Sequence, residues 1–187
     1  ERLRNPQELQ FDDYGNLFTA DNDGDRGDME RINYLVEGGD SGWTAGHQSL
    51  MIFTRKFNFR SYKYGGKKGL YNPWNTDLMW KVRSEQQPAF LLPGIGQIEG
   101  GPSGFLYNPS TSMGPEYNKK FFVIHYKGSL AKSNISMFNT EEEGAGFKTT
   151  NHKFFMKGSN CVDIEFGPDG RMYMSDYNYG GWENQNV

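Results

Sequence analysis

The chain of 187 residues contains 24 glycines and 16% aromatic residues, and its formal net charge at pH 7 is −3. This balance argues against nucleic acid and against an anionic membrane surface as partners. No apolar run reaches the roughly 18 residues of a membrane-spanning helix. The lone Cys161 excludes an internal disulfide framework and a CxxCH haem attachment within these residues.

Nine runs of apolar and aromatic residues, separated by Gly, Asp, Asn and Pro, predict β-strands. In chain order they lie at 7–11, 16–20, 31–36, 103–107, 120–126, 134–138, 152–156, 161–166 and 171–175. Helical periodicity of any length is absent from the sequence. The sequence therefore predicts an all-β protein.

Two stretches of the chain share one pattern, and a third follows it more loosely. Residues 6–22 align without a gap on residues 161–177, and both contain a strand ending at an aromatic residue, a turn with glycine and a second strand ending at aspartate. Residues 102–125 have a longer loop between their strands. Each stretch is expected to form a β-hairpin. The residues expected at equivalent places between adjacent sheets are Phe11, Tyr107 and Phe166.

Repeats of this kind stack as the blades of a β-propeller, because one four-stranded unit cannot bury both of its faces alone. At about 40–50 residues per blade, the chain holds about three to four blades. A closed propeller has roughly four to eight blades. We therefore expect residues 1–187 to form an incomplete arc, which is closed by the rest of its own propeller or by partner subunits.

Residues 48–84 interrupt the blade pattern with interleaved aromatic and basic side chains. Such a mixture can stack on the bases of single-stranded nucleic acid. Because the chain is acidic overall, we interpret the segment as an insertion between blades, with aromatic residues that cover one face of the propeller. No nucleic-acid partner is expected.

The densest polar cluster of the chain spans residues 21–30. Carboxylates in a glycine-containing loop are the hard oxygen ligands that Ca²⁺ prefers. The loop is not an EF-hand, since the sixth and twelfth positions counted from Asp21 are Arg26 and Ile32. Either the loop binds calcium, or it is solvated and Arg26 and Arg31 pair with its carboxylates. The candidate metal ligands in it are Asp21, Asp23, Asp25 and Asp28.

The sequence contains no GxSxG, HExxH or P-loop motif, and its three histidines lie in different segments. His125 ends an apolar strand, in register with Asp21 and Asp176 of the repeat. We expect it to be the histidine that faces a ligand.

Five motifs keep a distinctive order and spacing: RNPQ at 4–7, GDMERI at 27–32, EGGDSGW at 37–43, GPSGF at 101–105 and DIEFGPDG at 163–170. Together they resemble the glucose/sorbosone dehydrogenase family, and most closely the membrane-bound dehydrogenases of planctomycete type, some of which are fused to c-type cytochrome domains. The resemblance implies a six-bladed propeller that oxidises a sugar or an alcohol in the periplasm or outside the cell. It also implies pyrroloquinoline quinone (PQQ) and calcium as cofactors.

The resemblance implies roles for individual residues as well. Arg4 and Asn5 match a cofactor-contacting pair of the family, and a guanidinium can grip a carboxylate with two hydrogen bonds. Gly42 and Trp43 match the segment whose backbone carbonyls bind calcium, so they join the candidate metal ligands. The candidate cofactor-binding residues are Arg4, Asn5 and His125. The family's catalytic histidine base would precede Glu1, so no residue of this chain is assigned that role.

Asn160 and Val162 stand where the quinoproteins of the family have arginines. Two lost charge-assisted contacts, at roughly 1.5–3 kcal/mol each, would weaken cofactor binding by several orders of magnitude. We therefore expect this chain to carry no PQQ, and the intact protein to bind it weakly if at all. Two interpretations follow. One is a quinoprotein-like dehydrogenase domain with a c-type cytochrome domain as its partner, and the other is a non-catalytic propeller that binds a protein or a carbohydrate.

Overall fold

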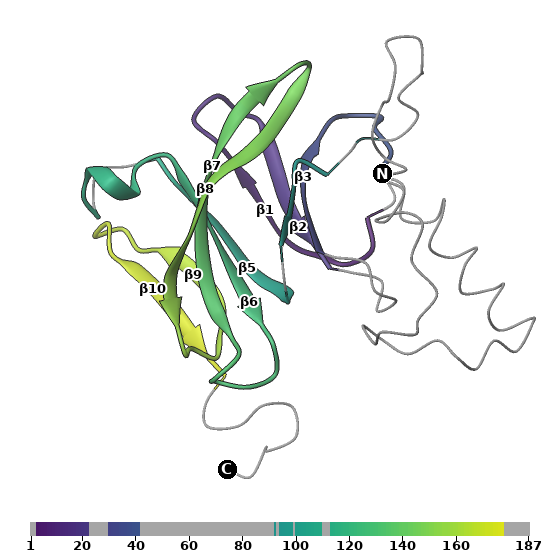
Figure 1. Cartoon of the computed structure of the whole chain (residues 1–187). Coiled ribbons are helices and arrows are strands. Elements are labelled where there is room, and N and C mark those ends of the chain that lie inside the picture. Colours follow the sequence, from purple (N-terminus) through teal and green to yellow (C-terminus); the bar gives the residue numbers. More distant parts are fainter. Residues whose placement is uncertain are drawn as a thin grey trace, which may run out of the picture.

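The computed structural model describes residues 3–22, 30–41, 92, 94–98, 100–109 and 113–177. These residues form ten strands in three antiparallel sheets (Figure 1). Their helical structure is the short 3-10 helix η1 (Pro115–Tyr117), and no helix in this part of the chain could cross a membrane. The segment 48–84, interpreted above as an insertion, lies outside the described residues.

In each sheet, strands that follow one another in sequence are hydrogen-bonded neighbours. The first sheet contains β1 (Pro6–Phe11), β2 (Leu17–Asp21), β3 (Glu30–Leu35) and β4 (Gly96–Ile98). The second contains β5 (Gly101–Asn108), β6 (Lys120–Tyr126), β7 (Asn134–Glu143) and β8 (Gly146–Lys157). The third is the hairpin of β9 (Cys161–Phe166) and β10 (Met172–Asp176).

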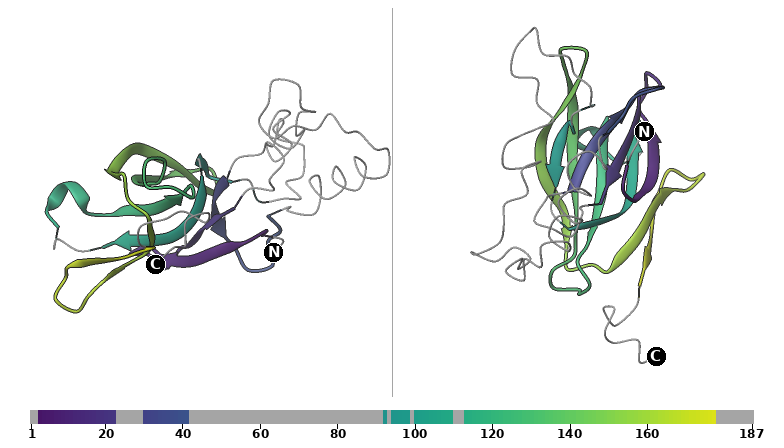
Figure 2. Two further views of the ribbon diagram at one scale, coloured as in Figure 1. Left: turned by 90° about the horizontal axis from the view of Figure 1, so that it is seen from below. Right: turned by 90° about the vertical axis from the view of Figure 1, so that its right-hand side faces the viewer.

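The three sheets lie side by side in chain order, as Figures 1 and 2 show from different directions. Their first strands are neighbours, because β1 contacts β5 and β5 contacts β9. The hairpins 6–21 and 161–176 therefore belong to different sheets, as the repeat predicts.

The two gapless repeats have the same turn. The amide of Gly15 donates to the carbonyl of Asp12 at 3.1 Å, and the amide of Gly170 donates to the carbonyl of Gly167 at 2.9 Å. Both Gly15 and Gly170 have a positive φ, of 81° and 74°. Glycine adopts this backbone conformation without steric cost, which explains its place in both turns.

All nine predicted strands are present, and β6 and β9 have the predicted bounds. The short β4 was not predicted, because its three residues carry too little pattern. The hairpin β7–β8 is longer than predicted, since its outer part is polar and exposed. Opposite charges support that part: Glu141 is paired with Lys148 across the strands, with 3.9 Å between their charged atoms.

Strand β6 of the second sheet is buried on both faces, which explains its continuous apolar run. Alternate residues of a strand point to opposite faces. Phe121 and Val123 pack toward the first sheet in a cluster with Phe18, whereas Phe122 and Ile124 pack toward β9. The ring of Phe121 lies 5.0 Å from that of Phe18, centroid to centroid. Edge-to-face contacts of this kind stabilise the junction between the first two sheets.

Two of the three aromatic residues predicted to lie between adjacent sheets do so among the described residues. Tyr107 is buried in the cluster between the first two sheets, and Phe166 packs against the cluster between the second and third. Phe11 is 59% exposed, because no described sheet covers its face of the first sheet. The neighbouring Gln10 is paired with the buried Phe18, and Phe11 therefore points to the opposite face of its sheet.

Candidate functional site

The neighbouring strands β1, β5 and β9 carry Glu8, Gly104 and Asp163 at equivalent positions, each three residues before the aromatic residue of the repeat. A Cβ at Gly104 would lie 3.2 Å from the Cα of Asp163. Glycine thus lets β5 approach β9 closely at this level. As a result, the two acidic side chains meet next to the middle strand.

The carboxyl group of Glu8 bridges the three strands. It accepts a hydrogen bond from the backbone N–H of Phe105 on β5 and forms a side-chain hydrogen bond with Asp163 on β9. Its own strand is held to β2 by the hydroxyl of Thr19, which donates to the carbonyl of Glu8 at 2.5 Å. One carboxyl group therefore connects all three sheets.

Burial and the hydrogen bond with Asp163 raise the pKa of Glu8 from 4.5 to about 8. The negative charges of Asp163 and Glu165 add to the rise, whereas the N–H of Phe105 opposes it. Two carboxylates in contact cannot both ionise cheaply, so a proton stays on the pair near neutral pH. Glu8 can then donate to Asp163 or release its proton in mildly alkaline solution.

A second polar centre is built around Asp21, whose side chain is 1% exposed. Its carboxylate accepts hydrogen bonds from the backbone amides of Arg4 at 3.0 Å and Asn5 at 2.8 Å. It also pairs with the guanidinium of Arg31 at 3.5 Å, which in turn donates to the carbonyl of Ser41. The structure thus brings together Arg4, Asn5 and Asp21, three candidate site residues of the sequence analysis. The carboxylate of Asp21 accepts the backbone hydrogen bonds of the other two.

The remaining candidate metal ligands lie outside the described residues: Asp23, Asp25, Asp28, Gly42 and Trp43. Among the residues that are described, no group of three or more His, Cys, Asp or Glu side chains could hold a metal ion. The calcium site therefore stays a prediction.

Asn160 and Val162 stand where the resembled family has arginines, so their surroundings bear on PQQ binding. Asn160 is buried, and its side-chain oxygen has no hydrogen-bond partner among the described residues. A buried oxygen without a hydrogen bond costs free energy, so a donor beside it would be favourable, whereas a carboxylate would be repelled. Because PQQ is a polycarboxylate, the oxygen of Asn160 would not suit a carboxylate of PQQ placed beside it.

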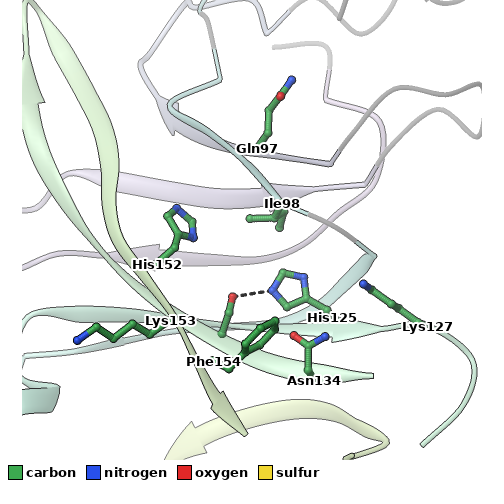
Figure 3. A pocket seen from close by; sticks show the side chains of 9 residues that line it. Gln97, Ile98, His125, Lys127, Asn134, His152, Lys153 and Phe154 are labelled. Carbon is green, nitrogen blue, oxygen red and sulfur yellow. Dashed lines mark hydrogen bonds between the residues drawn. The ribbon is translucent and has the colours of Figure 1, made fainter. Parts of the chain in front are cut away.

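His125 lies in a different place from Arg4 and Asn5. It is buried on β6, and its Nε2 lies 2.6 Å from the hydroxyl oxygen of Ser136 on β7. It lines a pocket of about 390 Å³ between β4 and the strands β6, β7 and β8 (Figure 3). Neither Arg4 nor Asn5 is among the described residues that line this pocket.

Sequence reasoning missed the pair of Glu8 and Asp163. The signal was in the repeat, since a gapless alignment of 6–22 on 161–177 places these two acids at the same position. It also missed Ser136 and the other residues around His125. These residues come together because β7 pairs with β6 and β8 pairs with β7, and no local pattern in the sequence indicates this pairing.

Comparisons with known proteins concern the fold. No protein-family model matches the sequence, and no curated protein matches it. Among solved structures, the chain is similar to a protein of Thermus thermophilus described as a proposed oxidoreductase (glucose dehydrogenase). The match has a TM-score of 0.58 and 15% sequence identity, and it covers 94% of this chain. The two chains share a fold.

The chain spans 39% of the length of that Thermus protein. At such low identity the likeness establishes the fold alone. The activity of the whole protein is therefore a matter for proposal.

Proposed function

We propose that this chain forms consecutive blades of a six-bladed β-propeller of the glucose/sorbosone dehydrogenase type. The whole protein would oxidise a sugar or an alcohol in the periplasm or outside the cell. The observation that supports this best is the fold similarity to the Thermus thermophilus protein over 94% of the chain. The five motifs that resemble the dehydrogenase family point to the same function.

The exposed face of the first sheet supports the propeller. Leu9 and Phe11 of β1 are 55% and 59% exposed, on the face turned away from the second sheet. In a propeller, the preceding blade would cover this face. Burying the exposed half of these two side chains would contribute about 2–3 kcal/mol. The rest of the same propeller, or a partner subunit, is the occupant that this chemistry suits.

The described residues would act in two ways. Asp21 would orient Arg4 and Asn5 toward a bound substrate or cofactor, because it holds both of their backbone amides. Glu8 on β1 and Asp163 on β9 would share a proton. Calcium would be held by the loop 21–30 together with the carbonyls of residues 42–43. No step is assigned to PQQ, because the oxygen of Asn160 would not suit one of its carboxylates.

An activity assay on the whole protein tests this proposal. The protein is incubated with Ca²⁺, with and without PQQ, and reduction of an electron-accepting dye is followed after addition of aldoses or alcohols. We expect substrate-dependent reduction that is lost in Asp21→Ala, together with calorimetric heat on Ca²⁺ titration. A folded protein that reduces no dye with any of these substrates would refute the dehydrogenase proposal.

The second candidate function is a propeller without catalysis that binds a protein or a carbohydrate. Asn160 and Val162 favour it, since they remove two cations from the position that would bind an anionic quinone. Calorimetry with PQQ and Ca²⁺ separates the two candidates. Micromolar or tighter binding with dye reduction supports the enzyme. A folded protein that binds no quinone, reduces no dye and retains a glycan or a partner protein supports the binding function.

A further inference from the structure

The pocket that contains His125 is separate from the region of Glu8 and Asp21. Its described walls come from β4, from β7 and β8, and from the end of β6, and none of its described lining residues belongs to β1, β5 or β9. Its volume of about 390 Å³ suits a small ligand. No role in the proposed oxidation is assigned to it.

One face of the second sheet forms the floor of the pocket. Asn134 and Ser136 are two residues apart on β7, so their side chains point to the same face. The strand register places His125 of β6 opposite Asn134, and Phe154 of β8 opposite Ser136. These four side chains all line the pocket. Figure 3 shows His125, Asn134 and Phe154 next to one another on this floor.

The walls of the pocket offer aromatic rings and an aliphatic side chain. The rings are those of His125, His152 and Phe154, and Ile98 of β4 adds an aliphatic group from the first sheet. The ring of His152 stacks on Phe138 at 5.2 Å, and burial lowers its pKa, so this ring is uncharged near pH 7. Phe154 is 59% exposed, so much of its ring is open to a ligand. A flat aromatic ligand can pack among these rings in offset or edge-to-face geometry.

The side-chain oxygen of Asn134 gives the pocket a defined hydrogen-bonding position. This oxygen is buried and has no hydrogen-bond partner among the described residues. The nitrogen of the same amide donates to the carbonyl of Lys132 at 3.4 Å, which leaves the oxygen as the acceptor. Beside it, His125 and Ser136 hold each other at 2.6 Å (Figure 3). A ligand that donates a hydrogen bond to Asn134 therefore satisfies a buried group that otherwise costs free energy.

The lysines of the pocket do not define the ligand. Lys153 extends away from the pocket in Figure 3. Lys127 interacts with other groups of the protein, so no contact with a ligand is assigned to it. The ligand is therefore defined by the aromatic walls and by the oxygen of Asn134.

We propose that this pocket binds a phenol, that is, a small aromatic ring with a hydroxyl group. The hydroxyl would donate to the side-chain oxygen of Asn134, and the ring would pack against Phe154 and Ile98. A sugar would bring several hydroxyl groups, each of which loses water on entry and needs a partner of its own. A methyl ether of the same aromatic ring lacks the donor.

Ligand-detected NMR titrations of the whole protein with phenol, anisole and D-glucose test the proposal. Phenol should bind with a dissociation constant on the order of 1 mM, as its small size allows. It should bind about tenfold more tightly than anisole, because anisole cannot donate to Asn134. D-Glucose should bind more weakly than phenol. Equal binding of phenol and anisole, binding of glucose as tight as that of phenol, or no binding of phenol at millimolar concentration would each overturn it. This comparison uses the wild-type protein and needs no variant.

Three variants locate the contacts. Asn134→Leu keeps a side chain of similar size without the acceptor, so it should weaken phenol about tenfold and leave anisole unchanged. Phe154→Ala should weaken both ligands about threefold or more. The matched control is Tyr173→Ala, since Tyr173 is a similarly exposed aromatic residue of β10 outside the described lining and should affect neither ligand.

Circular dichroism confirms that each variant is folded. If Phe154→Ala and Tyr173→Ala behaved alike in folded proteins, the proposed site would be wrong. Asn134 would not be the acceptor if Asn134→Leu kept the preference for phenol over anisole. The assay needs no catalysis, so its result is independent of the dehydrogenase proposal.

Discussion

The proton held by Glu8 should make the stability of the protein depend on pH. Burial, and then the hydrogen bond with Asp163, raise the pKa of Glu8 from 4.5 to about 8 in the folded state. The folded protein therefore binds this proton more tightly than the unfolded chain does. The resulting stabilisation is complete below a pH of 4.5 and is lost as the pH rises through about 8.

The size of the effect follows from the position of the pair. The full rise in pKa would correspond to about 5 kcal/mol. Glu8 is only partly buried and Asp163 is exposed, so solvent screening reduces this to about 1–2 kcal/mol. For a chain of this length, such a loss lowers the melting temperature by roughly 2–8 °C. We expect this fall between about pH 4.5 and pH 8.

The variant Glu8→Gln isolates the contribution of this proton. A glutamine amide can donate to Asp163 and accept from the N–H of Phe105 at every pH. Chemical denaturation should show a free energy of unfolding close to wild type at pH 4.5, and about 1–2 kcal/mol above wild type at pH 9. The control is Glu142→Gln, at an exposed glutamate of β7, which should keep the wild-type pH dependence. If Glu8→Gln lost as much stability as the wild type between these pH values, the shared proton would not be the cause.

Three further substitutions test the packing described above, each by urea denaturation. Asp21→Asn should cost about 3 kcal/mol, because it leaves the buried guanidinium of Arg31 without its carboxylate; a loss below about 1 kcal/mol would mean that Arg31 is well solvated. Gly104→Ala should cost about 1–3 kcal/mol, since the new Cβ would lie 3.2 Å from the Cα of Asp163. An unchanged midpoint would show that β5 and β9 are further apart. Phe121→Ala should cost about 3–5 kcal/mol, because the side chain is fully buried. Retained near-ultraviolet dichroism and stability would contradict this core.

The dehydrogenase proposal rests on the fold similarity and on the motif order. Asn160 matters to this proposal, since its buried oxygen favours a hydrogen-bond donor over a carboxylate.

Local pattern in the sequence determined the strands and the repeat. Alternation of apolar and polar residues has a period of two residues, and glycine marks turns that need a positive φ. Both signals act within a few residues, so β6 and β9 could be predicted with their bounds, and the shared turn of the two hairpins could be predicted as well. The same signals were too weak for β4 and for the polar outer part of β7 and β8.

Only the tertiary structure decided which side chains meet. Glu8 and Asp163 are 155 residues apart, and their contact depends on the close approach of β5 and β9 at Gly104. Phe11 has the same pattern as Phe166, yet it is exposed because the second sheet packs on the opposite face of β1. The surroundings of His125 come from separate strands for the same reason. A strand's own sequence determines the alternation of its faces, whereas the packing of neighbouring sheets determines which face is covered and which polar groups share a pocket.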